Sequence, residues 1–259
     1  MINAPEIDSH AHVWDASCTY VAGSRYRPAY TAAIETYLSI LDRNRIDRSV
    51  LVQPSFLGTD NSYMLRVLSA HRDRLRAIVV VDPSISDDEL DDLTAGGVIG
   101  LRYNLIGRDP DILSTPDFAA LTDRATERGW WIEVHAAGGN WSRVLPAMTG
   151  VKLMIDHFGR PSATDCAGFA EILKRAPQRT CIKFSAAYRQ RVISIDGVAR
   201  RLIAHFGAQS CLWGSDWPWT QFEDRMSYAD AIGLLDTITT ENERLSMRGS
   251  AAALSDFAL

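Results

Sequence analysis

Short apolar runs alternate with amphipathic stretches along the whole chain. Several runs, such as residues 77–81, are apolar at consecutive positions, which is typical of parallel strands buried on both faces. The predicted strands span residues 7–14, 49–54, 77–82, 98–103, 131–136, 153–157, 180–185 and 211–215. Apolar residues at helical spacing predict helices over residues 33–44, 62–70, 117–128 and 198–206. Eight strands with helices between them predict an α/β fold, a (β/α)8 TIM barrel rather than an open doubly wound sheet.

The length of 259 residues suits one barrel domain over residues 1–259, because such barrels commonly take about 250 residues. No glycine-rich phosphate loop follows the first strand, which disfavours a nucleotide-binding fold. The long segment 16–31 after that strand is predicted to be a lid or binding loop. Residues 241–259 are expected to form a helix packed on the outside.

Composition narrows the class of protein further. A net charge of -5 argues against broad binding to nucleic acid. The four cysteines lack Cys-x-x-Cys spacing, which fits free thiols in a reducing compartment. Residues 1–4 do not begin a signal peptide, and no apolar run approaches the length of a membrane span. We therefore expect a cytoplasmic protein without nucleic-acid or membrane partners, and homo-oligomerisation stays open.

Polar residues lie at the predicted carboxyl ends of the strands, where barrels of this kind place their active sites. They are His10 and His12 on the first strand, Ser55 after the second, Arg102 on the fourth, and His135, His157 and Asp216 at the ends of the fifth, sixth and eighth. His10 and His12 share one strand face, so their rings can converge on a metal ion or a substrate atom. Four of the six histidines fall at strand ends, which indicates a site rather than scattered structural histidines.

Asp216 is the strongest single candidate for catalysis. A carboxylate at the end of the eighth strand can take a proton from attacking water or bind a metal ion. Its structural alternative is to cap a helix N-terminus. His157 can polarise a carbonyl group or protonate a leaving oxygen. Asp156 precedes His157 and is expected on the opposite strand face, away from the pocket.

Several arginines are candidates for binding an acidic substrate. Arginine holds carboxylates through a planar donor fork that lysine lacks. Arg102 lies in an apolar strand, where its alternative role is an ion pair with a carboxylate of the barrel. Arg108 lies in the loop that follows and is either a substrate ligand or an exposed arginine. Arg160 and Arg189 can face the mouth of the barrel, although Arg160 equally suits a bridge within its loop.

These motifs resemble the amidohydrolase superfamily, specifically its amidohydrolase 2 branch. The matching motifs are Asp8-Ser9-His10-Ala11-His12, Val134-His135, Ile155-Asp156-His157-Phe158-Gly159 and Trp213-Gly214-Ser215-Asp216-Trp217-Pro218. Three further segments make the chain similar to lactonases of that branch: Tyr26-Arg27-Pro28, Val52-Gln53-Pro54-Ser55 and Gly100-Leu101-Arg102-Tyr103-Asn104. The resemblance spans nearly the whole chain.

The resemblance implies a hydrolase that opens a small carboxylated lactone by attack of activated water. The substrate would resemble 2-pyrone-4,6-dicarboxylate, a muconolactone or a sugar lactone, from aromatic-compound degradation or sugar-acid metabolism. It implies that Arg102 and Arg108 bind substrate carboxylates and that Tyr26, Ser55 and Arg189 line the pocket. The resemblance also implies that Asp216 is the general base that takes a proton from the attacking water.

The resemblance also bears on a metal cofactor. Superfamily members often hold one divalent ion, and zinc is the ion expected here. The residues that match this ligand set are His10, His12, His135 and Asp216. The pyrone dicarboxylate lactonases, however, work without a metal and carry tyrosine where this chain has His135. The fourth strand offers no lysine for a bridging carbamate, since Lys152 and Lys183 lie elsewhere, so a binuclear centre is not expected.

Two other functions fit part of the pattern. A metal-dependent nonoxidative decarboxylase of the same branch would share the histidines and the aspartate. The paired arginines and the Val52-Gln53-Pro54-Ser55 segment favour the lactonase. A non-catalytic barrel that binds carboxylates is disfavoured, because it would not need Asp216 together with four histidines.

Overall fold

The computed structural model describes residues 6–163, 166–190 and 194–254. Eight parallel strands pair in chain order. They are β1 (Ile7–Ala11), β2 (Arg48–Val52), β3 (Leu75–Val79), β4 (Val98–Asn104), β5 (Trp131–His135), β6 (Leu153–Ile155), β7 (Thr180–Phe184) and β8 (Cys211–Trp213). A parallel bridge from Ala11 to Trp217, just past β8, closes the sheet. The predicted (β/α)8 barrel is confirmed, with all eight strands in the predicted places.

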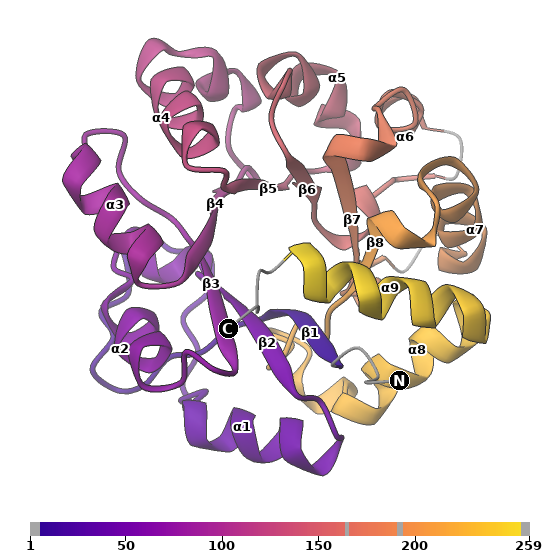
Figure 1. Ribbon diagram of the computed structural model, residues 1–259, viewed down its shortest axis with the longest axis horizontal. Coiled ribbons are helices and arrows are strands. Elements are labelled where there is room, and N and C mark those ends of the chain that lie inside the picture. Colours follow the sequence, from indigo (N-terminus) through magenta and orange to yellow (C-terminus); the bar gives the residue numbers. More distant parts are fainter. Residues whose placement is uncertain (1–5, 164–165, 191–193, 255–259) are drawn as a thin grey trace.

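Helices surround the sheet (Figure 1). They are α1 (Ile34–Arg43), α2 (Ser62–Ala70), α3 (Asp87–Ala95), α4 (Pro116–Glu127), α5 (Trp141–Val144), α6 (Ala167–Ile172), α7 (Ile195–Phe206), α8 (Tyr228–Ile238) and α9 (Glu241–Leu254). The four helices predicted from periodicity correspond to α1, α2, α4 and α7. The predicted last helix is α9, which packs against β8 and β1, and residues 255–259 of that prediction lie outside the described part.

Two further predictions bear on the chain as a whole. The four cysteines are free thiols, as predicted. No helix among the described residues is long and apolar enough to cross a membrane. The assignment of residues 1–259 to one domain stays a prediction. The prediction that residues 1–4 do not begin a signal peptide concerns residues outside the described part.

The barrel interior changes in character from one end to the other. Strand β5 shows the sequence of layers, because residues two apart on a strand face the same way. Trp131 belongs to an apolar cluster that fills the amino-terminal end, together with Ala251 of α9. Glu133 lies in a buried ionic layer above that cluster, and His135 lines the cavity at the carboxyl end. From the amino-terminal to the carboxyl end, the barrel interior therefore consists of an apolar layer, a layer of buried charged residues and the cavity.

A β-bulge in β1 sets the direction of the first histidine. Residues 8–11 pair with the shorter segment 49–51, so β1 contains one extra residue there. Without a bulge, Asp8 and His10 would face the same way. Instead Asp8 faces outward and accepts a hydrogen bond from Tyr37 of α1, whereas His10 points into the barrel.

Candidate active site

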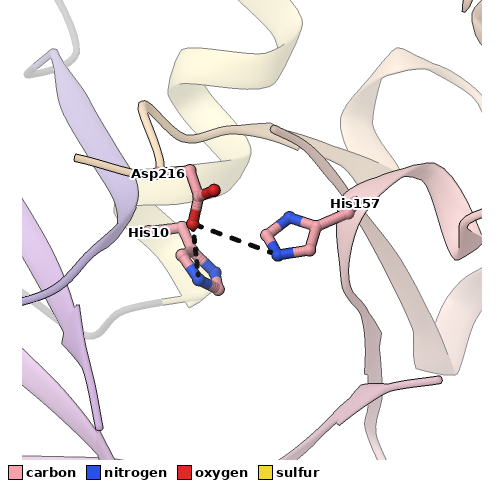
Figure 2. Close-up of side chains that lie close together, drawn as sticks. All are labelled: His10, His157 and Asp216. Carbon is pink, nitrogen blue, oxygen red and sulfur yellow. Dashed lines mark ion pairs between the residues drawn. The ribbon is translucent and has the colours of Figure 1, made fainter. Parts of the chain in front are cut away.

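A carboxylate lies at the centre of a group of histidines at the carboxyl end of the barrel. The Oδ1 atom of Asp216 is 3.6 Å from His10 Nε2, 3.4 Å from His12 Nε2 and 4.0 Å from His157 Nε2. Figure 2 shows His10, on β1, and His157, just past β6, approaching this oxygen from different sides. We call these four residues the Asp216 cluster. The predicted convergence of His10 and His12 on one point is present in the structure.

The second oxygen of Asp216 is held from the other side. Its Oδ2 accepts hydrogen bonds from the Tyr188 hydroxyl and from Arg189 Nε, the latter at 3.1 Å. Burial alone would raise the pKa of Asp216, but the Arg189 guanidinium and the neighbouring histidines outweigh it and hold this pKa well below its usual range. Asp216 is therefore ionised at neutral pH, with Oδ2 fixed and Oδ1 available to accept a proton.

The backbone adopts an uncommon conformation at both catalytic candidates, Asp216 and His157. Asp216 and His157 have left-handed conformations, with φ of 57° and 53°, which cost non-glycine residues about 1–3 kcal/mol each. The amide of Asp216 donates to the carbonyl of His10 at 2.8 Å, and the Gln190 side chain donates to the carbonyl of His157 at 2.8 Å. Gly214 lets the chain approach β1, since a Cβ there would lie 2.6 Å from His10 Cβ.

The histidine rings are oriented by their second nitrogens. His12 Nδ1 lies 2.7 Å from the carbonyl oxygen of Val52, so this nitrogen donates and the ring turns Nε2 toward Asp216. His157 Nδ1 lies 2.8 Å from the hydroxyl of Ser185. Burial holds the pKa of His157 well below its usual range, so its ring is neutral at neutral pH.

His135 lies beside the Asp216 cluster rather than in it. Its ring centroid is 4.7 Å from that of His157, and its Nε2 is 3.2 Å from Arg160 Nη1. One buried group of potential metal ligands contains His10, His157 and Asp216, and another contains His135, Asp156 and His157. His157 thus joins the Asp216 cluster, and the assignment of His135 as a metal ligand stays a prediction.

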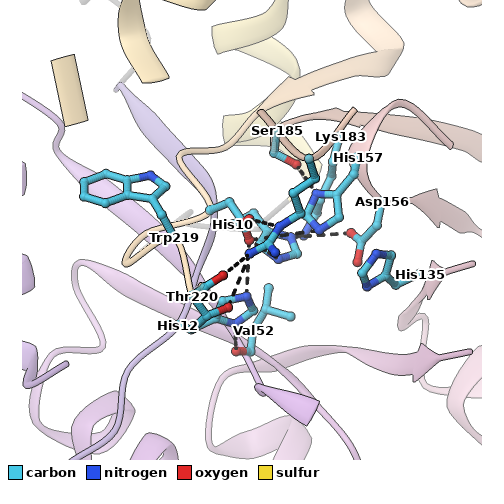
Figure 3. A network of polar contacts seen from close by, with 12 residues as sticks. His10, His12, Val52, His135, Asp156, His157, Lys183, Ser185, Trp219 and Thr220 are labelled. Carbon is cyan, nitrogen blue, oxygen red and sulfur yellow. Dashed lines mark hydrogen bonds and ion pairs between the residues drawn. The ribbon is translucent and has the colours of Figure 1, made fainter. Parts of the chain in front are cut away.

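Below this cluster, a layer of charged residues fills the barrel. Figure 3 shows two of them, Asp156 and Lys183, together with His10 and His157. Arg102 contacts Glu133 through Nε at 3.0 Å and donates from Nη2 to Asp156 Oδ2 at 3.0 Å. Lys183 forms an ion pair with Glu133 and a hydrogen bond with His10. Arg102 therefore forms an ion pair with carboxylates of the barrel, which is the structural alternative given for it in the sequence analysis. Its side chain also lines the cavity. Its role as a substrate ligand stays a prediction.

Asp156 is not among the residues that line the cavity, as expected, but the prediction that it lies on the opposite strand face is wrong, and two charged residues were missed. Asp156 faces the interior because it lies two residues after Met154, which belongs to the apolar cluster of the barrel floor. Glu133 and Lys183 are fully buried in the same layer. Residues two apart on a strand face the same way, so the position of Glu133 two residues before His135 indicated that it faces the interior. Lys183 likewise lies two residues after the interior residue Cys181.

A cavity of about 320 Å³ opens at the Asp216 cluster. The predicted substrate-binding residues that line it are Tyr26, Ser55, Arg102, Arg160 and Arg189. Arg108 is exposed and is not among the lining residues, so its role stays a prediction. Arg25, from the long loop after β1, lines the cavity and was not predicted. Guanidinium groups from several loops make the cavity suited to an anionic ligand.

The predicted lid loop, residues 16–31, is fastened to the loop after β8. The hydroxyls of Tyr26 and Tyr30 donate to Glu223 Oε1 at 2.8 and 2.6 Å. The indole of Trp14 also donates to the carbonyl of Tyr30 at 2.8 Å. These contacts fix Tyr26 at the cavity wall.

We expect Glu223→Ala to raise KM about tenfold or more while kcat changes little, because a hydrogen bond to a charged group contributes about 1.5–3 kcal/mol. Loss of both tyrosine hydrogen bonds would loosen the loop that carries Tyr26 and Arg25. Steady-state kinetics measures this, with Glu241→Ala on exposed α9 as the control. An unchanged KM would show that Glu223 does not position the loop.

Comparison with known proteins identifies the family. The amidohydrolase family model matches residues 7–255, so the chain belongs to this family, whose wider superfamily often uses a divalent metal ion. The chain is 27% identical over 245 residues to 2-pyrone-4,6-dicarboxylate hydrolase of Comamonas testosteroni, covering 86% of this chain and 80% of that one. It is 27% identical over 250 residues to 4-sulfomuconolactone hydrolase of Rhizobium radiobacter, covering 89% and 81%.

Solved structures agree with this assignment. A probable 2-pyrone-4,6-dicarboxylic acid hydrolase from Acinetobacter baumannii, crystallised with citric acid, has a TM-score of 0.90 and 30% identity, covering 96% of this chain and 98% of that one. A 5-carboxyvanillate decarboxylase from Sphingomonas paucimobilis has a TM-score of 0.68 at 15% identity, which shows the shared fold alone. The predicted family resemblance is confirmed, and the relatives of higher identity carry the names of lactone-cleaving hydrolases.

Proposed function

We propose that this chain is a lactone hydrolase that opens a small acidic lactone by attack of activated water. The observation that carries the proposal is the geometry of Asp216. One carboxylate oxygen is fixed by Tyr188 and Arg189, and the other faces three histidines at a cavity lined with guanidinium groups. The names of the relatives support lactones with acid groups as the substrate class.

The residues of the cavity supply each step. Asp216 Oδ1 takes a proton from water, and the water oxygen attacks the lactone carbonyl carbon. When the Ser185 hydroxyl donates to His157 Nδ1, the proton of the ring lies on Nε2 and can be donated to the carbonyl oxygen. One such donor contributes about 3–4 kcal/mol to the transition state. The ring C–O bond then breaks, and the proton taken by Asp216 neutralises the leaving oxygen.

The Asp216 cluster also has donor atoms placed to hold one divalent ion, with zinc as the first candidate. His10 Nε2 is buried and makes no hydrogen bond with any residue in the described ranges. The three Nε2 atoms lie 3.4–4.0 Å from Asp216 Oδ1, and ligands of one tetrahedral ion lie about 3.3 Å apart. Such an ion would act as a Lewis acid on the carbonyl group.

The proposal is tested by following ring opening of 2-pyrone-4,6-dicarboxylate and 4-sulfomuconolactone by ultraviolet absorbance. The protein is assayed with its metal content known, before and after chelation. We expect hydrolysis of at least one acidic lactone. Carbon dioxide release from hydroxybenzoate-type acids, without opening of any lactone, would replace the proposal with the decarboxylase alternative.

The pH dependence of kcat/KM gives a separate prediction. The pKa of Asp216 is held well below 3.8 and that of His157 well below 6.5, so Asp216 stays ionised and the His157 ring stays neutral down to acidic pH. We expect kcat/KM to stay level as the pH falls through neutrality to 6.5 and to be lost only below it, as these groups gain protons. A pH–rate profile with its midpoint at 6.5 or above would contradict this assignment.

A further inference from the structure

Lys183 is a buried cation that the proposed reaction does not use. It lies on β7 with no exposed surface, forms an ion pair with Glu133, and places its Nζ 3.3 Å from His10 Nδ1. An ammonium group has three donors and no acceptor. In this hydrogen bond, His10 Nδ1 is therefore the acceptor and carries no proton.

Two carboxylate oxygens also approach His10 Nδ1, but neither accepts its proton. Asp156 Oδ1 lies at 3.4 Å and Glu133 Oε1 at 3.8 Å. Both are farther from His10 Nδ1 than Lys183 Nζ is, and Glu133 Oε1 pairs instead with Arg102 Nε at 3.0 Å. Because His10 Nδ1 accepts from Lys183, the proton of the neutral ring must lie on Nε2, which points at Asp216 Oδ1.

We propose that Lys183 is a positioning residue that keeps the proton of His10 on Nε2 and so lowers the affinity of the Asp216 cluster for a divalent ion. A histidine that ligates a metal presents an unprotonated nitrogen to it and donates from its other nitrogen to a carbonyl or carboxylate. His12 is arranged in this way, with Nδ1 donating to Val52. His10 is arranged in the opposite way, with Nδ1 as the acceptor from Lys183 and Nε2 at 3.6 Å from Asp216 Oδ1.

Charge balance in the ionic layer supports the same conclusion. Glu133 and Asp156 carry two negative charges, and Arg102 and Lys183 carry two positive ones. The layer is therefore neutral without a metal ion beside it. A neutral side chain at position 183 would leave one carboxylate in excess and would let His10 Nδ1 donate to Asp156, which frees Nε2 for an ion.

The test compares wild type with Lys183→Met. Zinc affinity is measured by competition with a chromophoric chelator, and the His10 tautomer by nitrogen-15 NMR of histidine-labelled protein. The His10 signals are assigned by their loss in His10→Gln. We expect wild-type His10 to be protonated on Nε2, and Lys183→Met to shift the proton to Nδ1 and bind zinc about 10–100-fold more tightly. Lys174→Met is the control, because Lys174 pairs with Glu171 at the surface.

A wild-type His10 protonated on Nδ1, or an unchanged zinc affinity in Lys183→Met, would overturn the proposal. If Lys183→Met does not fold, Lys183→Met/Glu133→Gln removes both charges of the ion pair and takes its place. The inference concerns the site of the proposed hydrolase but rests on its geometry alone. Neither readout depends on the substrate, so a failed lactone assay and a failed tautomer test are distinguishable.

Discussion

Asp216→Asn is expected to lower kcat about 10²- to 10⁴-fold with little change in KM, because it removes the proton acceptor while keeping the shape of the side chain. The amide oxygen can still accept hydrogen bonds from Tyr188 and Arg189. Substrate binding through the guanidinium groups of the cavity should therefore survive. Steady-state kinetics on the lactone identified by the absorbance assay measures the effect.

The control for this variant is Asp224→Asn, an exposed aspartate on the same segment after β8. Its kcat should equal that of the wild type. Thermal unfolding of Asp216→Asn checks that the loss of turnover is not a loss of folded protein. Near-normal turnover in Asp216→Asn would remove the assigned role of general base.

The second large effect is expected on stability. Arg102→Met should lower the free energy of unfolding by about 3–5 kcal/mol, because removing one member of a buried ion pair leaves its partners buried and uncompensated. Glu133 and Asp156 are both fully buried beside Arg102. Denaturant unfolding measures the loss, which separates the structural role of Arg102 from its predicted role in binding substrate.

Arg160→Met is the matched variant for this experiment. Arg160 also lines the cavity, but its hydrogen bond goes to the neutral side chain of His135. We expect this variant to keep its stability and to raise KM about tenfold or more, as loss of a charge-assisted hydrogen bond does. If Arg102→Met were as stable as Arg160→Met, the ionic layer would not stabilise the barrel.

Local sequence was sufficient for the fold and for much of the mouth of the barrel. Parallel strands buried on both faces give apolar runs, and all eight were recognisable without knowledge of their partners. The carboxyl ends of the strands lie at one end of such a barrel, so His10, His12, His135, His157 and Asp216 were all predicted to lie there. Helix α3 was missed because only Leu90 among its residues is buried and its other positions are largely acidic.

The sequence by itself determined the family, the strand order and which catalytic residue types reach the barrel mouth, because these follow from local patterns. Only the tertiary structure decided what each residue contacts. Lys183 meets Glu133 and His10 across 50 and 173 positions, and the bulge in β1 turns His10 toward them. A ring nitrogen gains or loses its proton according to the groups packed against it, and strands distant in sequence supply those groups only once the barrel closes.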